Sequence, residues 1–539
     1  MNRCTLPLAL VLSACGADPQ LVLPSQADIE QPTVVLVTPN LDDDDFDGAA
    51  DWSQGGGVED DNDRSTLQVL NKNRDSTLTY FGEEADIRVW FEGRQVLGEG
   101  VGLTWALPER DKKDGITVQI EARTWGGLGE LVVTDDKKEE SARISVIGSP
   151  PTIGHHLLPS RDLWIVDTDF GGGYNNQVMV DALRAEFGDT FFVVDGSTVG
   201  EDQWMQDEPE FLRMWSPESS TTLILDSIRD GNGWGGLDPF PESIAGGDVW
   251  VDTYGPGNRD ATTYDAFGNL EASPPIDGYP LGRAYYGWNE KTGPDDEGPH
   301  PDMRSFLASL SVQEPFVADT SWLCVGHIDE VTSFVPDPSA PRGFRFLIAD
   351  TTLGWELMAS QDGATRLDRH GRSGDAGHSR GTFGDYSGDL ALKGYNEDMQ
   401  ADHLDPILAT FREELNLTDD EIIRIPSLFE EVFIDGFLCG AAAVVPGTVN
   451  LLMVTNEDGT GGTAVIPDPF LRPPGASQDD DPLIAAWKEL LPSGVRPVFV
   501  DDWNMYHMQL GEVHCGTNQV RDPAMAANPS MDWLKEVTQ

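Results

Sequence analysis

A cysteine near the end of the chain lies between a histidine and a glycine, within residues 511–518. At the close of an apolar run, such a thiol suits presentation on a tight turn as a nucleophile, whose reactive form is the thiolate. The pattern alone is weak, because a lone cysteine is more often a small buried apolar residue. Two distant stretches, residues 204–210 and 326–330, supply an imidazole and two carboxylates. Together these groups suit nucleophilic attack on a cationic, planar substrate.

Each of these side chains also has a simpler structural interpretation. His327 and Asp329 could be a core histidine and its partner, which is the commoner fate of such a pair. Asp207 could be a surface acid, and Trp204 a plain core residue. The occurrence of several motifs together is what favours chemistry.

The three stretches, taken with three more, resemble the catalytic domain of the protein-arginine deiminases, calcium-dependent enzymes that convert peptidyl arginine to citrulline. The additional stretches are Leu225-Asp226-Ser227, residues 265–275 and residues 333–336. The resemblance extends from roughly Ser145 to the C-terminus. It implies an α/β catalytic domain in the form of a five-bladed α/β propeller (pentein), although no sequence repeat shows one.

The resemblance also implies a role for each side chain. Cys515 would add to the guanidinium carbon as a thiolate, forming a covalent thiouronium intermediate. His327 would protonate the departing ammonia and then activate the water that releases citrulline. Asp207 and Asp329 would accept bidentate hydrogen bonds from the guanidinium, and Trp204 would lie along its aliphatic stem. Because His327 and Asp329 lie two residues apart, we expect both to face one side of a strand.

Calcium is the cofactor that the resemblance implies. Glu208 and Glu210 crowd Asp207, and carboxylates so close raise one another's pKa unless a cation lies between them. The expected ligands of one ion are Gln206, Glu210, Glu271 and the backbone carbonyls of Phe267 and Leu270. Those of a second ion are Glu208, Asp226, Ser227 and Asp230, the last standing where an asparagine is usual.

Two positions depart from the family pattern. The family commonly places two arginines near Arg229 to bind the substrate backbone, but Gly231 takes the second place here. Gln509 stands where some members have arginine. Binding of a peptide backbone is therefore expected to differ, which leaves free arginine or small guanidino compounds open as substrates.

The composition is strongly acidic. Lys and Arg number 35 and Asp and Glu 93 among 539 residues, giving a formal net charge of −58. This argues against nucleic acid as a partner, since phosphate binding needs clustered cations. It favours cationic partners, either metal ions or arginine-bearing substrates, although acidic residues that merely keep the protein soluble would also explain much of the excess.

The first residues predict export. Arg3 precedes an apolar stretch that is too short to span a bilayer, and residues 12–15 resemble a bacterial lipobox. We expect residues 1–14 to be a signal peptide, Cys15 to carry the lipid, and residues 15–30 to be a tether. Cys324, Cys439 and Cys515 remain, too few for a disulfide scaffold. Pairing of Cys324 with Cys439 stays open, whereas Cys515 must be free to react.

A small β-rich domain is predicted over residues 31–149. Residues 33–37 look like a strand and lead into an acidic loop in which Asn40, Asp42 and Asp44 alternate, as oxygen ligands of calcium do. The alternative is a solvated acidic loop. Alternating patterns at residues 87–91, 116–120, 131–133 and 144–147 indicate an antiparallel, immunoglobulin-like sandwich.

Strand and helix patterns alternate in the second domain, predicted over residues 150–539. Residues 163–166 and 191–194 are strand-like. Asp405-Pro406 and Asp481-Pro482 each predict an N-cap and a first-turn proline ahead of an apolar helical face. Periodicity alone gives a mixed α/β domain.

The function that these features favour is calcium-dependent hydrolysis of arginine side chains in proteins or peptides by an exported, lipid-anchored enzyme. One alternative is another guanidino-modifying enzyme, either an amidinotransferase or a hydrolase of free arginine or agmatine. A second alternative is a non-catalytic, calcium-binding surface lipoprotein. The intact thiol, imidazole and two aspartates argue against the latter.

We predict that Cys15→Ala releases the protein from membranes, because the thiol of Cys15 is the expected site of lipidation. Fractionation of cells that express each form measures this. Unchanged membrane association of the Cys15→Ala form would contradict the lipobox assignment.

Overall fold

The chain divides into two compact units. The first comprises residues 1–150 with the short stretches 214–221 and 246–248, and the second comprises the rest, so the division falls beside the predicted boundary at residue 150. The computed structural model describes residues 20–22, 34–41, 51–54, 64–70, 76–108, 115–135, 141–215, 220–229, 236–247, 249–253, 261–289, 298–310, 312–371 and 380–521.

The first unit contains two five-stranded sheets that share one apolar core. Their strands, in spatial order, are β1 (Gln20–Val22), β3 (Ser65–Leu70), β8 (Ile116–Ala122), β5 (Ile87–Phe91) and β6 (Arg94–Gly98), and then β2 (Val34–Val37), β10 (Ser141–Gly148), β9 (Gly126–Asp135), β4 (Ser76–Phe81) and β7 (Thr104–Ala106). Each predicted strand of this domain lies in one of them. The pairing is antiparallel except between β2 and β10, which run parallel and so depart from the expected fully antiparallel sandwich.

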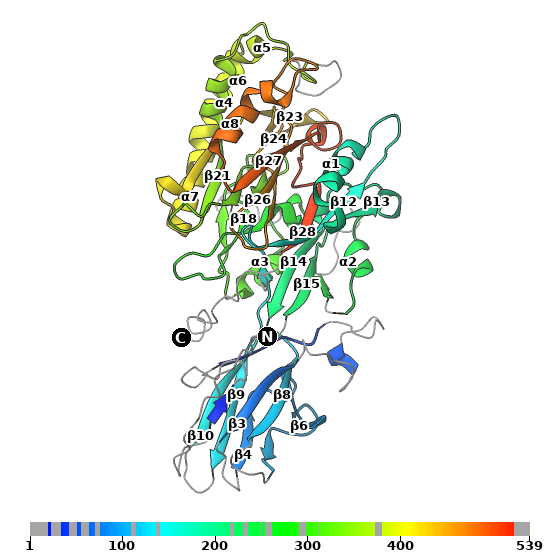
Figure 1. Cartoon of the computed structure of the whole chain (residues 1–539), viewed down its shortest axis with the longest axis vertical. Helices are drawn as coiled ribbons and strands as arrows, with labels where there is room; N and C mark the ends of the chain where they lie inside the picture. Colours follow the sequence, from blue (N-terminus) through cyan, green and yellow to red (C-terminus); the bar gives the residue numbers. More distant parts are fainter. Residues whose placement is uncertain are drawn as a thin grey trace, which may run out of the picture. The chain divides into compact units, whose positions relative to one another are not determined.

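The second unit is built of small sheets and helices (Figure 1). Its sheets, in spatial order, are β11 (Thr152–Ile153), β14 (Pro209–Trp215), β15 (Ser220–Asp226) and β16 (Val249–Thr253); β13 (Phe191–Asp195), β12 (Ser160–Asp167) and β28 (Thr517–Arg521); β17 (Leu270–Ala272), β18 (Ala284–Gly287) and β19 (Phe316–Ala318); β20 (Thr332–Pro336), β21 (Phe344–Asp350) and β22 (Ile422–Pro426); β25 (Leu452–Thr455), β26 (Gly462–Pro467) and β27 (Val495–Val500). A separate hairpin consists of β23 (Phe429–Ile434) and β24 (Phe437–Ala443).

One strand–helix–strand unit recurs in each of these five sheets. Two neighbouring strands run parallel, as β12 and β13 do, and the chain between them contains a helix, as crossover connections require. The helices are α1 (Gln177–Phe187), α2 (Phe240–Ser243), α3 (Pro301–Ser309), α4 (Thr351–Ala359), α5 (Phe383–Ser387), α6 (Leu390–Met399), α7 (Asp405–Leu415) and α8 (Pro482–Leu490). The second unit is thus the mixed α/β structure that was expected.

The two capped helices predicted from Asp-Pro pairs behave differently. Asp481 caps α8, because its side chain accepts hydrogen bonds from the backbone N–H groups of Leu483 and Ile484. The prediction for Asp405 is wrong as to the cap. The chain is already helical before it, since a π-helical turn (Gln400–Leu404) joins α6 to α7 and leaves Asp405 inside the continuous helix.

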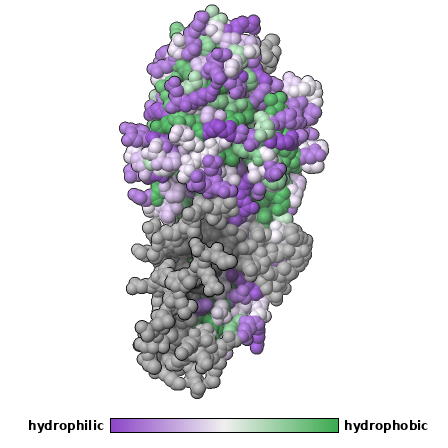
Figure 2. Space-filling view, in the orientation of Figure 1, coloured by the Kyte–Doolittle hydropathy of each residue, from purple (hydrophilic) through white to green (hydrophobic). Residues whose placement is uncertain are grey.

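Hydrophilic residues dominate the visible face of the second unit, with smaller apolar areas between them (Figure 2). Large apolar side chains, among them Phe334, Phe346 and Phe411, are buried in its main core. No helix among the described residues is long and apolar enough to cross a membrane.

Candidate active site

Gly268 lies among three of the predicted catalytic side chains. A Cβ atom added to it would be 2.7 Å from His327 Nδ1, 3.1 Å from Asp207 Oδ1 and 3.2 Å from Asp329 Oδ2. The Sγ atom of Cys515 lies 3.7 Å from Asp329 Oδ2. The structure therefore brings together the four side chains that the sequence singled out, and all four are buried.

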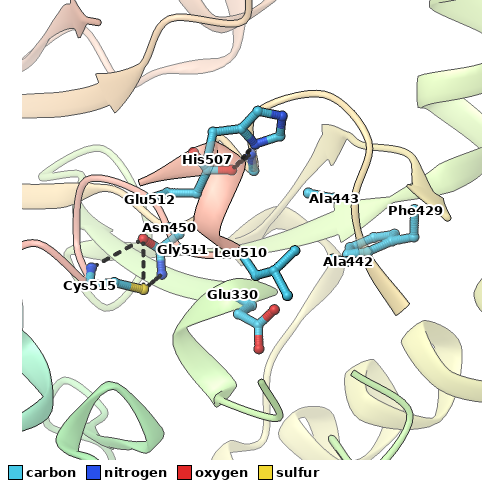
Figure 3. Close-up of a pocket in the computed structure, with 11 residues that line it drawn as sticks. Glu330, Phe429, Ala442, Ala443, Asn450, His507, Leu510, Gly511, Glu512 and Cys515 are labelled. Carbon is cyan, nitrogen blue, oxygen red and sulfur yellow. Dashed lines mark hydrogen bonds and ion pairs between the residues drawn. The ribbon is translucent and has the colours of Figure 1, made fainter. Parts of the chain in front are cut away.

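Cys515 is presented on a turn that leads into β28, as predicted. The Oδ1 atom of Asn450 accepts hydrogen bonds from the backbone N–H groups of His514 and Cys515, at 3.1 and 3.3 Å. Its Nδ2 atom then lies 3.3 Å from Cys515 Sγ (Figure 3). Cys515 is the free cysteine among the described residues, because Cys324 and Cys439 form a disulfide.

The prediction that His327 and Asp329 lie on a strand is wrong. Residues Ile328–Glu330 form a 3-10 turn with His327 as its N-cap. Glu330 Oε1 accepts hydrogen bonds from the backbone N–H groups of Gly326 and His327, which closes the turn. Gly326 has a φ of +91°, in the left-handed region that favours glycine.

The hydrogen bonds of His327 identify the nitrogen that faces the site. Its Nε2 atom lies 2.7 Å from the carbonyl oxygen of Thr263, which can only accept, so Nε2 carries a hydrogen. Its Nδ1 atom lies 3.7 Å from Asp207 Oδ1. Nδ1 is therefore the atom that can give or take a proton in the site.

Asp207 faces a cation of the chain itself. Its Oδ2 atom lies 3.3 Å from Nη1 of Arg229, and both residues are buried. Arg229 is predicted to bind the substrate backbone, and Asp207 is predicted to bind the substrate guanidinium. The structure places these two side chains against each other. Gly231 lies outside the described residues.

An open cleft of about 940 Å³ leads to Cys515. Trp204, predicted to lie along the substrate stem, lines it together with Gln509 and Gly511. A Cβ atom on Gly511 would be 2.3 Å from the ring of Trp204, so this glycine allows the indole to pack directly against the turn that bears the thiol.

Negative charge surrounds the thiol. Burial raises the pKa of Cys515 well above its ordinary value, and the carboxylates of Asp329 and Asp207 raise it further. These surroundings disfavour the thiolate. A cation placed between the two carboxylates would offset their effect and favour the thiolate.

A chain of buried charged groups extends from Asp329 away from the thiol. Asp329 Oδ2 lies 2.8 Å from His514 Nδ1, and His514 Nε2 lies 3.5 Å from Glu271 Oε1. Although burial opposes a charged imidazole, Asp329 and Glu271 hold the pKa of His514 above its ordinary value. On the other side of Glu271, Nε2 of His156 lies 3.3 Å from Oε2.

Comparison with known proteins identifies the family of this chain. A family model described as "Protein-arginine deiminase (PAD)" matches residues 146–527, more than half of the chain. The chain belongs to the protein-arginine deiminase family. The family expected from the sequence is thus confirmed.

Curated relatives match over part of their length. Protein-arginine deiminase type-4 of Rattus norvegicus is 32% identical over 331 residues, which cover 60% of this chain and 47% of the relative. Protein-arginine deiminase type-3 of Homo sapiens is 32% identical over 372 residues, which cover 65% and 51%. The chain therefore spans about half the length of the curated relatives that it matches.

Solved structures give more distant likenesses. An agmatine deiminase of C. jejuni covers 70% of this chain and 97% of its own, with a TM-score of 0.37 and 11% identity. The agmatine deiminase of Enterococcus faecalis covers 70% and 98%, with a TM-score of 0.36 and 10% identity. Likenesses this distant establish nothing about this chain.

The first set of expected metal ligands gathers around one small polar cavity. Gln206, Glu210, Leu270 and Glu271 line it, and Nε2 of Gln206 lies 3.5 Å from the carbonyl oxygen of Phe267. Burial and the neighbouring Glu271 raise the pKa of Glu210 well above its ordinary value, although Arg521 opposes this effect. The donors are buried oxygens, the ligand type that a hard cation prefers, and His156, His514 and Arg521 line the same cavity.

Of the second set of expected calcium ligands, the structure describes Glu208, Asp226 and Ser227. Glu208 is buried, and neither of its carboxylate oxygens has a hydrogen-bond partner among the described residues. Burial raises its pKa well above the ordinary value despite the nearby Arg229, and Asp226 adds to this. Ser227 is adjacent, since its backbone N–H donates to the carbonyl oxygen of Glu208 at 3.1 Å. A buried carboxylate without such a partner fits the role of a cation ligand. Asp230 lies outside the described residues.

The acidic loop of the first unit is less fully described. Asn40 is buried, and its Nδ2 atom donates to Glu121 Oε1 at 3.1 Å. Asp42 and Asp44, the other predicted calcium ligands there, lie outside the described residues. Calcium binding by this loop stays a prediction.

Sequence reasoning missed three residues of the site. Gly268 and His514 lie within the motifs, but only the fold shows that the glycine adjoins three predicted catalytic side chains and that the imidazole faces Asp329. Asn450 lies in no motif, and its position beside the thiol follows from the packing of the 447–451 segment against the cysteine turn. An asparagine between apolar residues gives no signal of its own.

We expect Gly268→Ala to lower kcat/KM by about 100-fold, because the added methyl group would lie 2.7 Å from His327 Nδ1 and displace a reacting group. Steady-state kinetics measure this. Gly394→Ala is the matched control, since a Cβ atom on that helical glycine meets nothing within 4 Å. Equal activity of the two variants would contradict this placement of Gly268.

Cys515 should react with neutral iodoacetamide more slowly than glutathione does at pH 8, because its raised pKa keeps the thiolate scarce until the pH rises further. Asp207→Asn removes a negative charge near the thiol and should speed labelling by iodoacetamide at the same pH. A cationic haloacetamidine should label the wild type faster than neutral iodoacetamide does, because carboxylates surround the thiol. Mass spectrometry of the Cys515 peptide measures each rate. Labelling of the wild type as fast as glutathione would contradict a raised pKa.

Proposed function

We propose that this deiminase hydrolyses the guanidinium group of arginine in polypeptides, giving citrulline and ammonia through a covalent intermediate on Cys515. The supporting observation is the convergence of His327, Asp207 and Asp329 around Gly268, with Cys515 Sγ beside Asp329. The family match agrees with this chemistry.

The two aspartates would bind and orient the substrate. A guanidinium presents planar pairs of N–H donors that match carboxylate oxygens. Asp329 Oδ1 is buried without a hydrogen-bond partner among the described residues, and Asp207 Oδ1 likewise. These oxygens are acceptors that a bound guanidinium would satisfy. Its positive charge would also favour ionisation of Cys515, whose pKa both carboxylates raise.

Proton transfer would pass through Nδ1 of His327. This nitrogen takes the proton of the Cys515 thiol, and Sγ bonds to the guanidinium carbon. Nδ1 returns the proton to one terminal nitrogen as the carbon–nitrogen bond breaks and ammonia leaves. Water then adds to the carbon and gives a proton to Nδ1. The carbon–sulfur bond breaks as Nδ1 returns that proton to Sγ, and the proton left on the added hydroxyl goes to the released ammonia, which gives citrulline and ammonium. His514 would hold Asp329 in position throughout.

The cleft favours arginine within a polypeptide over free arginine. Its volume of about 940 Å³ is at the upper end for small-molecule sites, so one arginine side chain fills only part of it. Its described lining also includes Glu201 and Asp202, and neither lysine nor arginine. A polypeptide that carries its arginine into this cleft would meet no opposing cation on the described walls.

We propose that activity depends on calcium. Gln206 and Glu208 directly flank Asp207 in the 3-10 turn Met205–Asp207 and its C-cap, so their side-chain oxygens are fixed relative to the substrate carboxylate. Gln206, Glu210, Glu271 and the carbonyls of Phe267 and Leu270 would hold one ion, and Glu208, Asp226, Ser227 and Asp230 another. Bound calcium would supply the positive charge that these buried carboxylates otherwise lack.

We also propose an architecture and a cellular location for this protein. The five strand–helix–strand units support a five-bladed arrangement of the catalytic domain, and the two sheets around one core support an immunoglobulin-like first domain. The lipobox supports export and attachment to a membrane through lipid alone.

Incubation with an arginine-containing peptide, free arginine and agmatine in turn tests the function. We expect citrulline and ammonia from the peptide with calcium present, little product from the two small compounds, and no turnover after exhaustive chelation. Cys515→Ser should lose activity by at least about 1000-fold, because a hydroxyl is a far weaker nucleophile here than a thiolate.

Undiminished ammonia release by Cys515→Ser would overturn the mechanism. Faster turnover of agmatine or free arginine would reassign the substrate. Full turnover in chelator would overturn the calcium requirement. The variant should show the same circular dichroism and melting temperature as the wild type, which separates lost chemistry from lost folding.

A further inference from the structure

Four exposed apolar side chains lie at the tip of the hairpin formed by β23 and β24, the two strands labelled in Figure 1. Phe433, Ile434, Phe437 and Leu438 are between 51% and 79% exposed. Asp435 and Gly436 between the strands both have positive φ, which gives a tight two-residue turn. Large apolar residues gathered at one exposed point indicate contact with another molecule.

The hairpin is fixed beside the active site. Ile434 and Cys439 line the same cleft as Cys515 and His327. The disulfide from Cys439 to Cys324 ties the hairpin to a segment only three residues before His327.

Backbone contacts hold the hairpin at the same place. Ala441 accepts a hydrogen bond from the N–H group of Cys324 at 2.8 Å, and its own N–H donates to Trp322 at 2.8 Å. A Cβ atom on Gly440 would be 2.7 Å from the backbone of Cys324, so the two segments touch directly. The tip therefore keeps a defined position relative to the catalytic imidazole.

A second exposed aromatic side chain belongs to the same cleft. Phe170 is 56% exposed and lines the cleft together with Ile434. The described lining combines these apolar groups with Glu201, Asp202 and Asp207. Apolar groups beside carboxylates complement a polypeptide in which apolar residues flank an arginine.

The negative charge of the chain disfavours two other molecules that could contact the hairpin tip, namely a second copy of the chain and an anionic membrane surface. Asp435 stands at the tip, Glu431 is exposed on β23, and the whole chain carries a net charge of −58. A second copy or an anionic membrane surface would bring like charges together. A polypeptide with a cationic arginine would bring the opposite charge.

We propose that the hairpin tip and Phe170 form a subsite for apolar side chains next to the target arginine of a polypeptide substrate. This inference rests on the proposed arginine hydrolysis. In this proposal the hairpin tip helps to determine which arginines of a polypeptide are modified. Its residues are different from those that carry out the chemistry.

Three substrates test the subsite in the full-length protein with calcium. They are Nα-acetyl-arginine amide, a pentapeptide with arginine between glycines, and one in which phenylalanine and leucine replace the glycines. We expect the wild type to prefer the apolar peptide over the glycine peptide by about tenfold in kcat/KM, as burial of an apolar side chain predicts. Ile434→Ser with Phe170→Ser, the exposed apolar residues of the subsite that line the cleft, should abolish that preference and leave turnover of the amide unchanged. Leu390→Ser, which removes an exposed apolar side chain that does not line the cleft, should keep it.

The possible failures are distinguishable. Turnover of the amide with equal kcat/KM for both peptides would overturn the subsite alone. A preference for the apolar peptide that survives the double substitution would also overturn the subsite. In that case, loss of dimerisation in the variant would assign the tip to self-association, and loss of vesicle binding would assign it to lipid. Failure of the wild type to release ammonia from any of the three substrates would instead overturn the proposed function.

Discussion

Negative charge held out of water is the constraint on which the active site depends. Asp207, Asp329 and Glu330 are packed around one thiol, and burial, with Asp329 adding to it, raises the pKa of Glu330 well above its ordinary value. Such groups cost several kcal/mol each unless a cation or a proton compensates them. The folded site is therefore prepared for positive charge. A guanidinium meets this need better than an ammonium does, because it stays charged at all relevant pH values and donates in a plane.

The carboxylates that are expected to bind the substrate and the expected metal donors belong to one connected network. His514 lies between Asp329, which faces the thiol, and Glu271, which lines the cavity of the expected calcium ligands. Asn450 adds a second connection, because it binds the backbone N–H groups of both His514 and Cys515. Glu271 is therefore connected through His514 to Asp329, one of the two carboxylates that are expected to bind the substrate.

The chemistry could be predicted from the sequence more fully than the geometry. Residue types in several separate motifs identified Cys515 and its three polar partners, and alternating patterns located the strands of the first unit. The strand assigned to His327 was wrong, because spacing by two does not distinguish a strand from a capped turn. The role of Asn450 could not be predicted, since it arises from contacts across 65 residues of sequence. The repeated strand–helix–strand units left no sequence repeat, because a buried strand requires only apolar residues, in no particular order.

A capped turn serves this site better than a strand would. On a strand, Glu330 would point away from Asp329, to the face opposite the site, and could not reach back to its own chain. In the turn, its carboxylate binds the N–H groups of Gly326 and His327, while the carbonyl oxygen of Thr263 fixes the imidazole from outside. Short hydrogen-bonded turns can therefore place several ionisable groups within a few ångströms of one another, which the alternating side chains of a sheet do not allow on one segment. Asp207, His327 and Cys515 all lie in such turns rather than in strands, and Gly268 stands close to three of the predicted catalytic side chains.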